Sequence, residues 1–308
     1  MLKFFLSVFI VLIGLVNNAV AQLDTFYIQP ISDAKTFALH STYKDFKLSF
    51  SSSIADEIIL QNNNLGLGFR GKYKKVGISL SIPVVSFNKS KFGKPKAFGF
   101  SFQLFPASFF VQGTFQYIKG FDDLRASDPA EIFRPHSQMI FTSLTGNYVF
   151  NHQRFSLRSA FKMINIQKKS AGSWIISIPI NHQYFSADSV SLPLKNQADF
   201  QFDLYRSFKV GLGGGYAYTK VWGNFSVTAL LSGGAEFRNL KYRTISNDAP
   251  KNEFLISPRI RFVASVVYNV PTFFYGIVGH YLPGIEVADG LNTRVENLRI
   301  RLVVGRRF

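Results

Sequence analysis

Apolar and polar residues alternate along most of the chain with a period of two. Within Leu65–Tyr73, for example, the apolar side chains Leu67 and Phe69 alternate with Gly68 and Arg70. Neighbouring strand residues point to opposite faces, whereas a helical face repeats every three or four residues. Similar stretches recur from about residue 36 to Phe308, so the pattern predicts an all-β, antiparallel protein with one apolar face on each strand.

The expected connections between these strands alternate in length. Short turns are predicted at residues 74–75, 106–108, 151–154, 219–223 and 269–272. Long loops are predicted at residues 53–63, 86–95, 119–137, 239–253 and 282–296. Short periplasmic turns and long outer loops are typical of transmembrane outer-membrane β-barrels. The pattern therefore predicts such a barrel with about 12–14 strands, an even number because both chain ends should be periplasmic.

Three local predictions follow from the same pattern. Asn62–Asn64 is expected to form a loop, because asparagine clusters favour turns. Phe155–Met163 is expected to return along Gln138–Phe150 as the second strand of a hairpin. Ala198–Tyr205 is expected to be a separate strand, which restores an even count.

The first 21 residues have the features of a cleaved signal peptide. Lys3 supplies a positive charge, Phe4–Val16 is an apolar run, and Ala19–Ala21 fits a small-residue cleavage site. The following residues, 22–35, are expected to form a short periplasmic lead, and residues 36–308 a single barrel domain in the cell outer membrane. No later stretch approaches the ~18 consecutive apolar residues of a helical span.

Composition supports an exported membrane protein and limits the partners that its positive charge is expected to contact. The chain has 34 Phe, 13 Tyr and no Cys, and its formal net charge is +17. Abundant aromatic residues fit lipid-facing strands and interfacial girdles. A basic chain often binds nucleic acid, but the export signal argues against that partner. The positive charge is expected to contact the phosphates of outer-membrane lipids and lipopolysaccharide, or to create an anion-favouring lumen.

Basic residues on the polar phase of the strands are the candidate lumen-lining residues. Charged side chains on the lipid face would cost ~2–4 kcal/mol at the midplane, so they are expected to point inward. The candidates are Arg70, Lys72, Arg158, Lys162, Arg259, Arg261, Arg299 and Arg301. Two alternatives stay open, namely a conducting basic pore and a closed lumen in which these residues pair with inner acids such as Asp203 and Glu236.

No motif predicts a catalytic, cofactor-binding or metal-binding residue. Two Asn-His phrases, at Asn151-His152 and Asn181-His182, each lie near a serine, but turn chemistry explains them better than catalysis. Asp122-Asp123 and His136 fall in a predicted loop where acidic residues are common, and nothing in the spacing brings them together.

Particular phrases add a family resemblance. Leu65–Arg70 reads LGLGFR, Lys169–Ser173 reads KSAGS, and Val210–Tyr218 reads VGLGGGYAY. With these phrases the chain resembles outer-membrane proteins of Bacteroidetes-type bacteria that carry the domain of unknown function number 4421. The resemblance implies a barrel in the outer membrane and brings no known activity or functional residue.

The functional expectation is a passive small-solute or anion pore, or a structural membrane protein. A surface enzyme acting on lipid or peptide, and a transporter of hydrophobic molecules, are alternatives. The final alternating stretch is in phase with Phe308, and it resembles the signal by which barrel-assembly machinery recognises its clients. We therefore expect that machinery to be a partner during membrane insertion, with Phe308 as the assembly signal.

Overall fold

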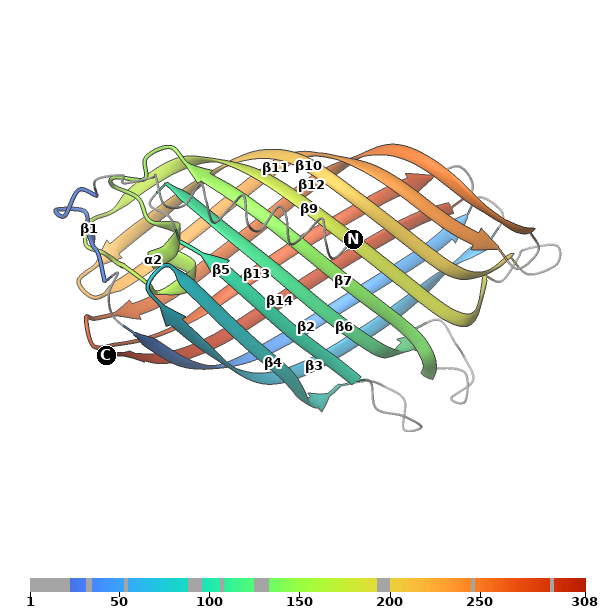
Figure 1. The fold of residues 1–308 in the computed structure, drawn as a ribbon, viewed down its shortest axis with the longest axis horizontal. Helices are drawn as coiled ribbons and strands as arrows, with labels where there is room; N and C mark the ends of the chain where they lie inside the picture. Colours follow the sequence, from blue (N-terminus) through green and yellow to red (C-terminus); the bar gives the residue numbers. More distant parts are fainter. Residues whose placement is uncertain are drawn as a thin grey trace.

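A computed structural model describes residues 23–31, 35–52, 55–87, 96–105, 108–124, 133–192, 200–244, 247–288 and 291–308. Within these ranges twelve strands close into an antiparallel barrel in the order β10-β11-β12-β13-β14-β2-β3-β4-β5-β6-β7-β9 (Figure 1). The prediction of an all-β barrel is therefore confirmed, at the lower end of the expected strand number. The expected signal peptide, residues 1–21, lies outside the described residues.

Most of the barrel strands are long. Their bounds are β2 Thr36–Ser52, β3 Ala55–Tyr73, β4 Val76–Ser86, β5 Lys96–Leu104, β6 Phe109–Asp123, β7 Phe133–Val149, β9 Ala171–Leu192, β10 Phe200–Trp222, β11 Phe225–Thr244, β12 Asn247–Asn269, β13 Phe273–Ala288 and β14 Leu291–Arg307. We call the end of the barrel that holds the β10–β11 and β12–β13 turns and Phe308 the turn end, and the opposite end the far end. Among the described residues, no helix has the length and apolar character needed to cross a membrane.

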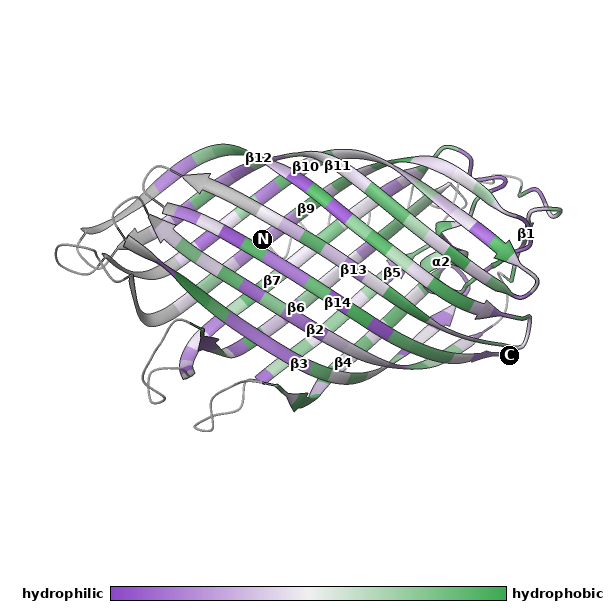
Figure 2. Cartoon of the chain, turned by 180° about the vertical axis from the view of Figure 1, so that it is seen from behind, coloured by the Kyte–Doolittle hydropathy of each residue, from purple (hydrophilic) through white to green (hydrophobic). Residues whose placement is uncertain are grey.

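An exposed apolar belt surrounds the half of the barrel next to the turn end. On β10 the outward side chains run from Tyr218 through Leu212 to Phe208, whereas the alternating residues Thr219 and Ser207 are buried inside. Figure 2 shows the same alternation of hydrophobic and hydrophilic residues along neighbouring strands. Apolar outer faces of this kind match the hydrocarbon core of a membrane.

Beyond the belt, towards the far end, the pattern inverts. On β2 the apolar residues Phe46, Leu48 and Phe50 are buried inside, while the outward positions Asp45 and Lys47 carry charges. Thirteen buried residues from eight strands form this inner apolar cluster, which includes Phe121, Phe185 and Tyr205. A transmembrane strand needs only ~9–11 residues, so the longest strands continue well past the belt around an apolar core.

Because of this inversion, several segments that were predicted as loops are strands. The predicted loops 53–63, 239–253 and 282–296 are largely strand, because polar residues on the outside of the extension resemble loop residues in the sequence. Asn62–Asn64 lies inside β3, where the Asn62 side chain donates to the Gly120 carbonyl and the Asn64 side chain donates to Asn62 Oδ1. Ala198–Tyr205 is not a separate strand, since its described residues begin β10.

The predicted hairpin of Phe155–Met163 along β7 is also wrong. Strand β7 pairs with β9 instead, and the segment between them turns into the barrel. There Leu157–Lys162 forms the helix α2, and Ile166–Gln167 forms β8, which pairs with β1 (Ile28–Gln29). The apolar residues Leu157, Ala160, Phe161 and Ile164 follow helical spacing and are buried, so the helical period prevails over the period of two.

Two seams between strands are incomplete. On the far-end side of the short hairpin β4–β5, strand β3 pairs directly with β6 through Leu60 and Gln61. Strands β12 and β13 pair over only eight residue pairs, from Phe262–Tyr281 to Asn269–Phe274. Towards the far end both strands continue without pairing to each other.

Candidate functional site

A cavity of about 170 Å³ lies in the lumen between the helix α2 and the inner apolar cluster. Leu157, Phe161 and Lys162 of α2 bound it at the turn end, and inward side chains of the barrel strands form its wall. Cavities of about 150 Å³ in other proteins hold a benzene molecule, so this space accommodates a small organic group.

Three arginines project into this cavity from two strands. On β14, Arg299 donates to Asn297 Oδ1 (3.0 Å) and Gln116 Oε1 (3.1 Å), and Arg301 donates to Thr42 Oγ1 (3.1 Å). On β12, Arg261 donates to Asn147 Oδ1 at 3.2 Å, and its buried Nε has no hydrogen-bond partner. Each of these contacts is to a neutral group, so none neutralises an arginine charge.

Lys162 brings a fourth cation from the helix. Its ammonium lies over the ring of Phe110, 5.6 Å from the centroid, and its side chain lines the cavity. Lys162 stands on α2 rather than on a membrane-spanning strand. Burial, reinforced by the charges of Arg301, Arg70 and Arg299, lowers the pKa of Lys162 well below its usual range.

The carboxylates of the described chain do not balance these charges. Five ion pairs within the described residues join Lys47 to Asp45, Arg134 to Asp123, Arg154 to Asp24, Arg259 to Glu236 and Arg294 to Glu296. Of these five pairs, only Arg259–Glu236 touches the cavity wall. Two like charges 4 Å apart repel by about 4 kcal/mol at an effective dielectric constant of 20, so an empty cationic cavity is electrostatically unfavourable.

Helix α2 is held in the lumen by hydrogen bonds at both of its ends. The Ser156 side chain caps the helix by accepting from the Ser159 amide, and Met163 ends it in the left-handed conformation at φ 51°. Wall side chains bind carbonyls near its C-terminus, with Ser265 Oγ donating to the Ala160 carbonyl at 2.7 Å and Arg307 donating to the Met163 carbonyl. The helix is therefore a fixed inner plug.

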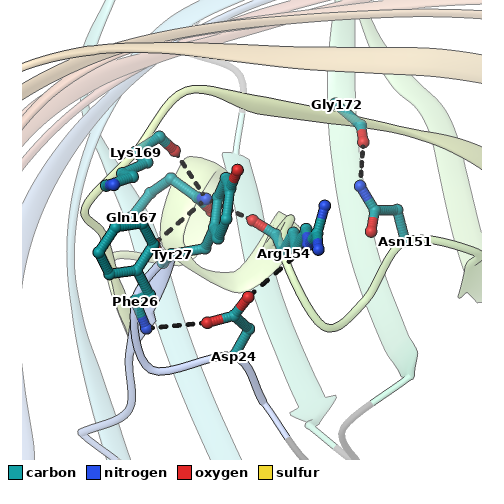
Figure 3. A network of polar contacts seen from close by, with 8 residues as sticks. All are labelled: Asp24, Phe26, Tyr27, Asn151, Arg154, Gln167, Lys169 and Gly172. Carbon is teal, nitrogen blue, oxygen red and sulfur yellow. Dashed lines mark hydrogen bonds and ion pairs between the residues drawn. The ribbon is translucent and has the colours of Figure 1, made fainter.

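The N-terminal lead closes over this plug at the turn end (Figure 3). Gln167 is the centre of the contact, because its Nε2 donates to the Tyr27 carbonyl of the lead (3.4 Å) and to the carbonyls of Arg154 (2.6 Å) and Lys169 (3.0 Å). Asp24 pairs with Arg154, and the ammonium of Lys169 lies 3.0 Å from the centroid of the Phe26 ring. These contacts join residues 24–29 to the segment around α2.

The other predicted lumen residues lie outside the cationic cluster. Arg70 is buried over the ring of Phe274, and Lys72 donates to the Ile31 carbonyl at the turn end. Arg158 lies on α2, not on the predicted strand, and donates to the Phe105 carbonyl. Arg259 pairs with Glu236, as the closed-lumen alternative expects of an inner acid.

His280, which the sequence pattern did not single out, lines the cavity opposite Arg299 across the β13–β14 pair. The signal was available, since His280 shares a strand phase with the inward residues Val278 and Phe274. The Asn-His phrases serve structural contacts, because His152 Nδ1 contacts the Val149 carbonyl and Asn181 donates to Glu236.

Residues 22–308 match the family described as Domain of unknown function (DUF4421). The chain belongs to this family. No curated protein matches the DUF4421 chain.

Solved outer-membrane barrels resemble the DUF4421 barrel in fold at very low identity. The outer membrane protease OmpT from Escherichia coli is 6% identical with a TM-score of 0.47, over 90% of this chain and 98% of that one. The translocator domain of the autotransporter NalP from Neisseria meningitidis is 8% identical with a TM-score of 0.41, over 88% of each chain. An outer membrane channel from Pseudomonas putida F1 is 12% identical with a TM-score of 0.38, over 92% of this chain and 98% of that one. Likeness at this level says nothing about activity.

Proposed function

We propose that this DUF4421 protein is an outer-membrane β-barrel that binds a small anion in its closed lumen. The observation that carries the proposal is the convergence of Lys162, Arg261, Arg299 and Arg301 on one cavity, with no carboxylate partner for any of them among the described residues. Buried charges are retained where they are paired, and a bound anion would supply the missing partner.

The location of the protein is part of the same proposal. The exposed belt fits a membrane, and a signal peptide at residues 1–21 would deliver the chain to the outer membrane of a Bacteroidetes-type bacterium. With the turn end facing the periplasm, the charged extension beyond the belt would stand among the headgroups of lipopolysaccharide.

A passive anion pore is the competing function. The plug α2 fills the lumen at the turn end, and the inner apolar cluster fills it towards the far end. Conduction would require at least one of these to move. A binding site needs no such movement, so the geometry favours binding over conduction.

Isothermal titration of the barrel in lipid nanodiscs tests the proposal, with acetate, octanoate and inorganic phosphate as probes. We expect at least one probe to bind the wild type, and the double variant Arg299→Gln/Arg301→Gln to bind it at least about 100-fold more weakly, because two charge-assisted hydrogen bonds contribute ~3–6 kcal/mol. The matched control Lys220→Gln/Arg306→Gln removes two exposed charges outside the lumen and should bind like the wild type.

A second readout separates a binding site from a structural cluster. Without ligand, the double variant Arg299→Gln/Arg301→Gln should be at least as resistant to urea as the wild type, because repulsion between the cations is reduced. Absence of binding by all three probes, together with steady anion-selective conductance in planar bilayers, would replace the proposal with the pore.

A further inference from the structure

The unpaired part of the β12–β13 seam forms a split in the barrel wall. Pairing between these strands stops at Phe262–Tyr281, although β12 continues to Asn247 and β13 continues to Ala288. The other edges of both strands stay paired, β12 with β11 as far as Asn247 and β13 with β14 as far as Ala288. The break is therefore local to this seam.

Prolines stand on both sides of the split. Pro258 lies in the unpaired part of β12, and Pro283 lies in the unpaired part of β13, two residues beyond the last paired residue. Proline has no amide hydrogen and disrupts a hydrogen-bonded ladder, so such residues keep strand edges from pairing. The sequence thus favours a seam that stays open at this level.

The inner side of the split leads to the cationic cavity. A second cavity, of about 40 Å³, is lined by Ser257 and Pro258 from β12 and by Leu282, Pro283 and Gly284 from β13. Phe141, Asn181, Arg259 and Leu282 line both this cavity and the larger one. Behind the split lies first the Arg259–Glu236 pair and then the three unpaired arginines.

The outer side of the split opens within the apolar belt. On the β12 lip the outward side chains Ile260, Ile256 and Phe254 are 52%, 70% and 77% exposed. The β13 lip begins at the half-exposed Tyr281, and the neighbouring strand carries Glu296 beside Pro283. Both lips are thus largely apolar on the outside and the arginines lie behind them, which suits a molecule with an apolar chain and a charged head.

We propose that the split between β12 and β13 is a lateral entrance through which a single-chain amphipathic anion passes between the membrane and the lumen. Its carboxylate or phosphate head binds among Arg261, Arg299 and Arg301, and its apolar chain lies in the split between Ile260 and Leu282. This inference rests on the proposed anion site and names its ligand class.

Two glycines on β13 allow a matched test. Gly284 lines the cavity at the split, where an added Cβ would meet only the Val295 carbonyl at an ordinary 3.5 Å. Gly279 is paired below the split with the lipid-facing Ala264, and an added Cβ there meets nothing within 4 Å. Gly284→Phe should fill the entrance, whereas Gly279→Phe adds the same ring outside it.

The assay measures the association of fluorescently detected dodecanoate and of acetate with barrels in lipid nanodiscs. We expect dodecanoate to bind the wild type at least about tenfold more tightly than acetate, since each buried methylene adds to the affinity. Gly284→Phe should slow dodecanoate association by about tenfold or more and leave the equilibrium affinity for acetate, which only contacts the arginines, within about twofold of the wild type. Gly279→Phe should stay within about twofold of the wild type in both measurements.

A measurement on the wild type covers the case in which Gly284→Phe does not fold. Dodecanoate bearing a diazirine at mid-chain is photolysed in the complex, and the labelled peptides are identified by mass spectrometry. Label in residues 254–262 and 280–284 supports the entrance. Label elsewhere, or equal rates of dodecanoate association with both phenylalanine variants, overturns it. If acetate, octanoate or phosphate binds and dodecanoate does not, the lateral entrance fails and the anion site stands. If none of these probes binds, both fail.

Discussion

Replacing Arg307 by methionine should release the plug α2 from the barrel wall. Arg307 donates to the Met163 carbonyl at the end of the helix, to the Val270 carbonyl and to Asn269 Oδ1, and its guanidinium lies 4.6 Å from the centroid of the Phe274 ring. Methionine keeps much of the apolar stem and removes every one of these polar contacts.

The size of the effect follows from the helix contacts alone. A hydrogen bond to a charged donor contributes ~1.5–3 kcal/mol, and leaving the buried Met163 carbonyl without its donor adds to the cost. The remaining wall contacts, from Ser265 to Ala160 and from Asn269 to Asn165, contribute ~1 kcal/mol each and stay in place. We therefore expect local opening of the plug to become easier by about 3 kcal/mol, which is about 150-fold in the opening equilibrium.

Hydrogen exchange with mass spectrometry measures this opening directly. Peptides covering residues 157–163 should exchange about 150-fold faster in Arg307→Met, while peptides from β10 keep their wild-type rate. Arg306→Met, on the exposed side of the same strand, is the control and should change neither. Unchanged protection of α2 in Arg307→Met would show that the helix is not held by this arginine, and the account of the plug would be wrong.

Three further predictions test the extension, the belt and membrane insertion. Phe50→Ala should lower the free energy of unfolding by ~3–5 kcal/mol in urea titrations, because Phe50 is fully buried against Phe185 and Tyr205; a loss below about 1 kcal/mol would contradict a packed far end. The two tryptophans, Trp174 and Trp222, are 64% and 56% exposed on the outer face, so brominated lipids should quench their fluorescence strongly and aqueous iodide should not. Strong quenching by iodide and none by brominated lipids would show that the belt does not lie in the membrane. Phe308→Asp should reduce the amount of the heat-modifiable, folded form in membranes, because Phe308 is 70% exposed beside Arg306 and its backbone pairs with Lys35. Insertion at the normal level would show that this side chain is not an assembly signal.

The barrel could be predicted from the sequence because the belt imposes a strict period of two. Val210–Tyr218 and Leu298–Val304 follow it throughout, and both stretches lie in the strands where the pattern placed them. Prediction was poorer where the solvent on the outer face changes from lipid to water. There the outward residues are polar and the inward ones apolar, so Glu286–Val295 resembles a loop although most of it is strand.

The candidate site was only partly predictable. Strand phase pointed to Arg261, Arg299 and Arg301, but which basic residues converge depends on register, and register is set across seams far apart in the sequence. The short segment Phe155–Met163 satisfies both periods, so its folding into the lumen depends on tertiary contacts such as those of Arg307 and Gln167. The split between β12 and β13 begins where the pairing of these strands stops. In the sequence only Pro258 and Pro283 mark that point.

Anomalous diffraction from crystals grown in bromide tests the anion site most directly. Bromide replaces the bound anion and shows its position without reference to any activity. We expect an anomalous peak inside the lumen, within hydrogen-bonding reach of the guanidinium groups of Arg299 and Arg301 or of Arg261, and its loss in Arg299→Gln/Arg301→Gln. Bromide peaks confined to exposed arginines on the outer surface, such as Arg206, with none in the cavity, would contradict it.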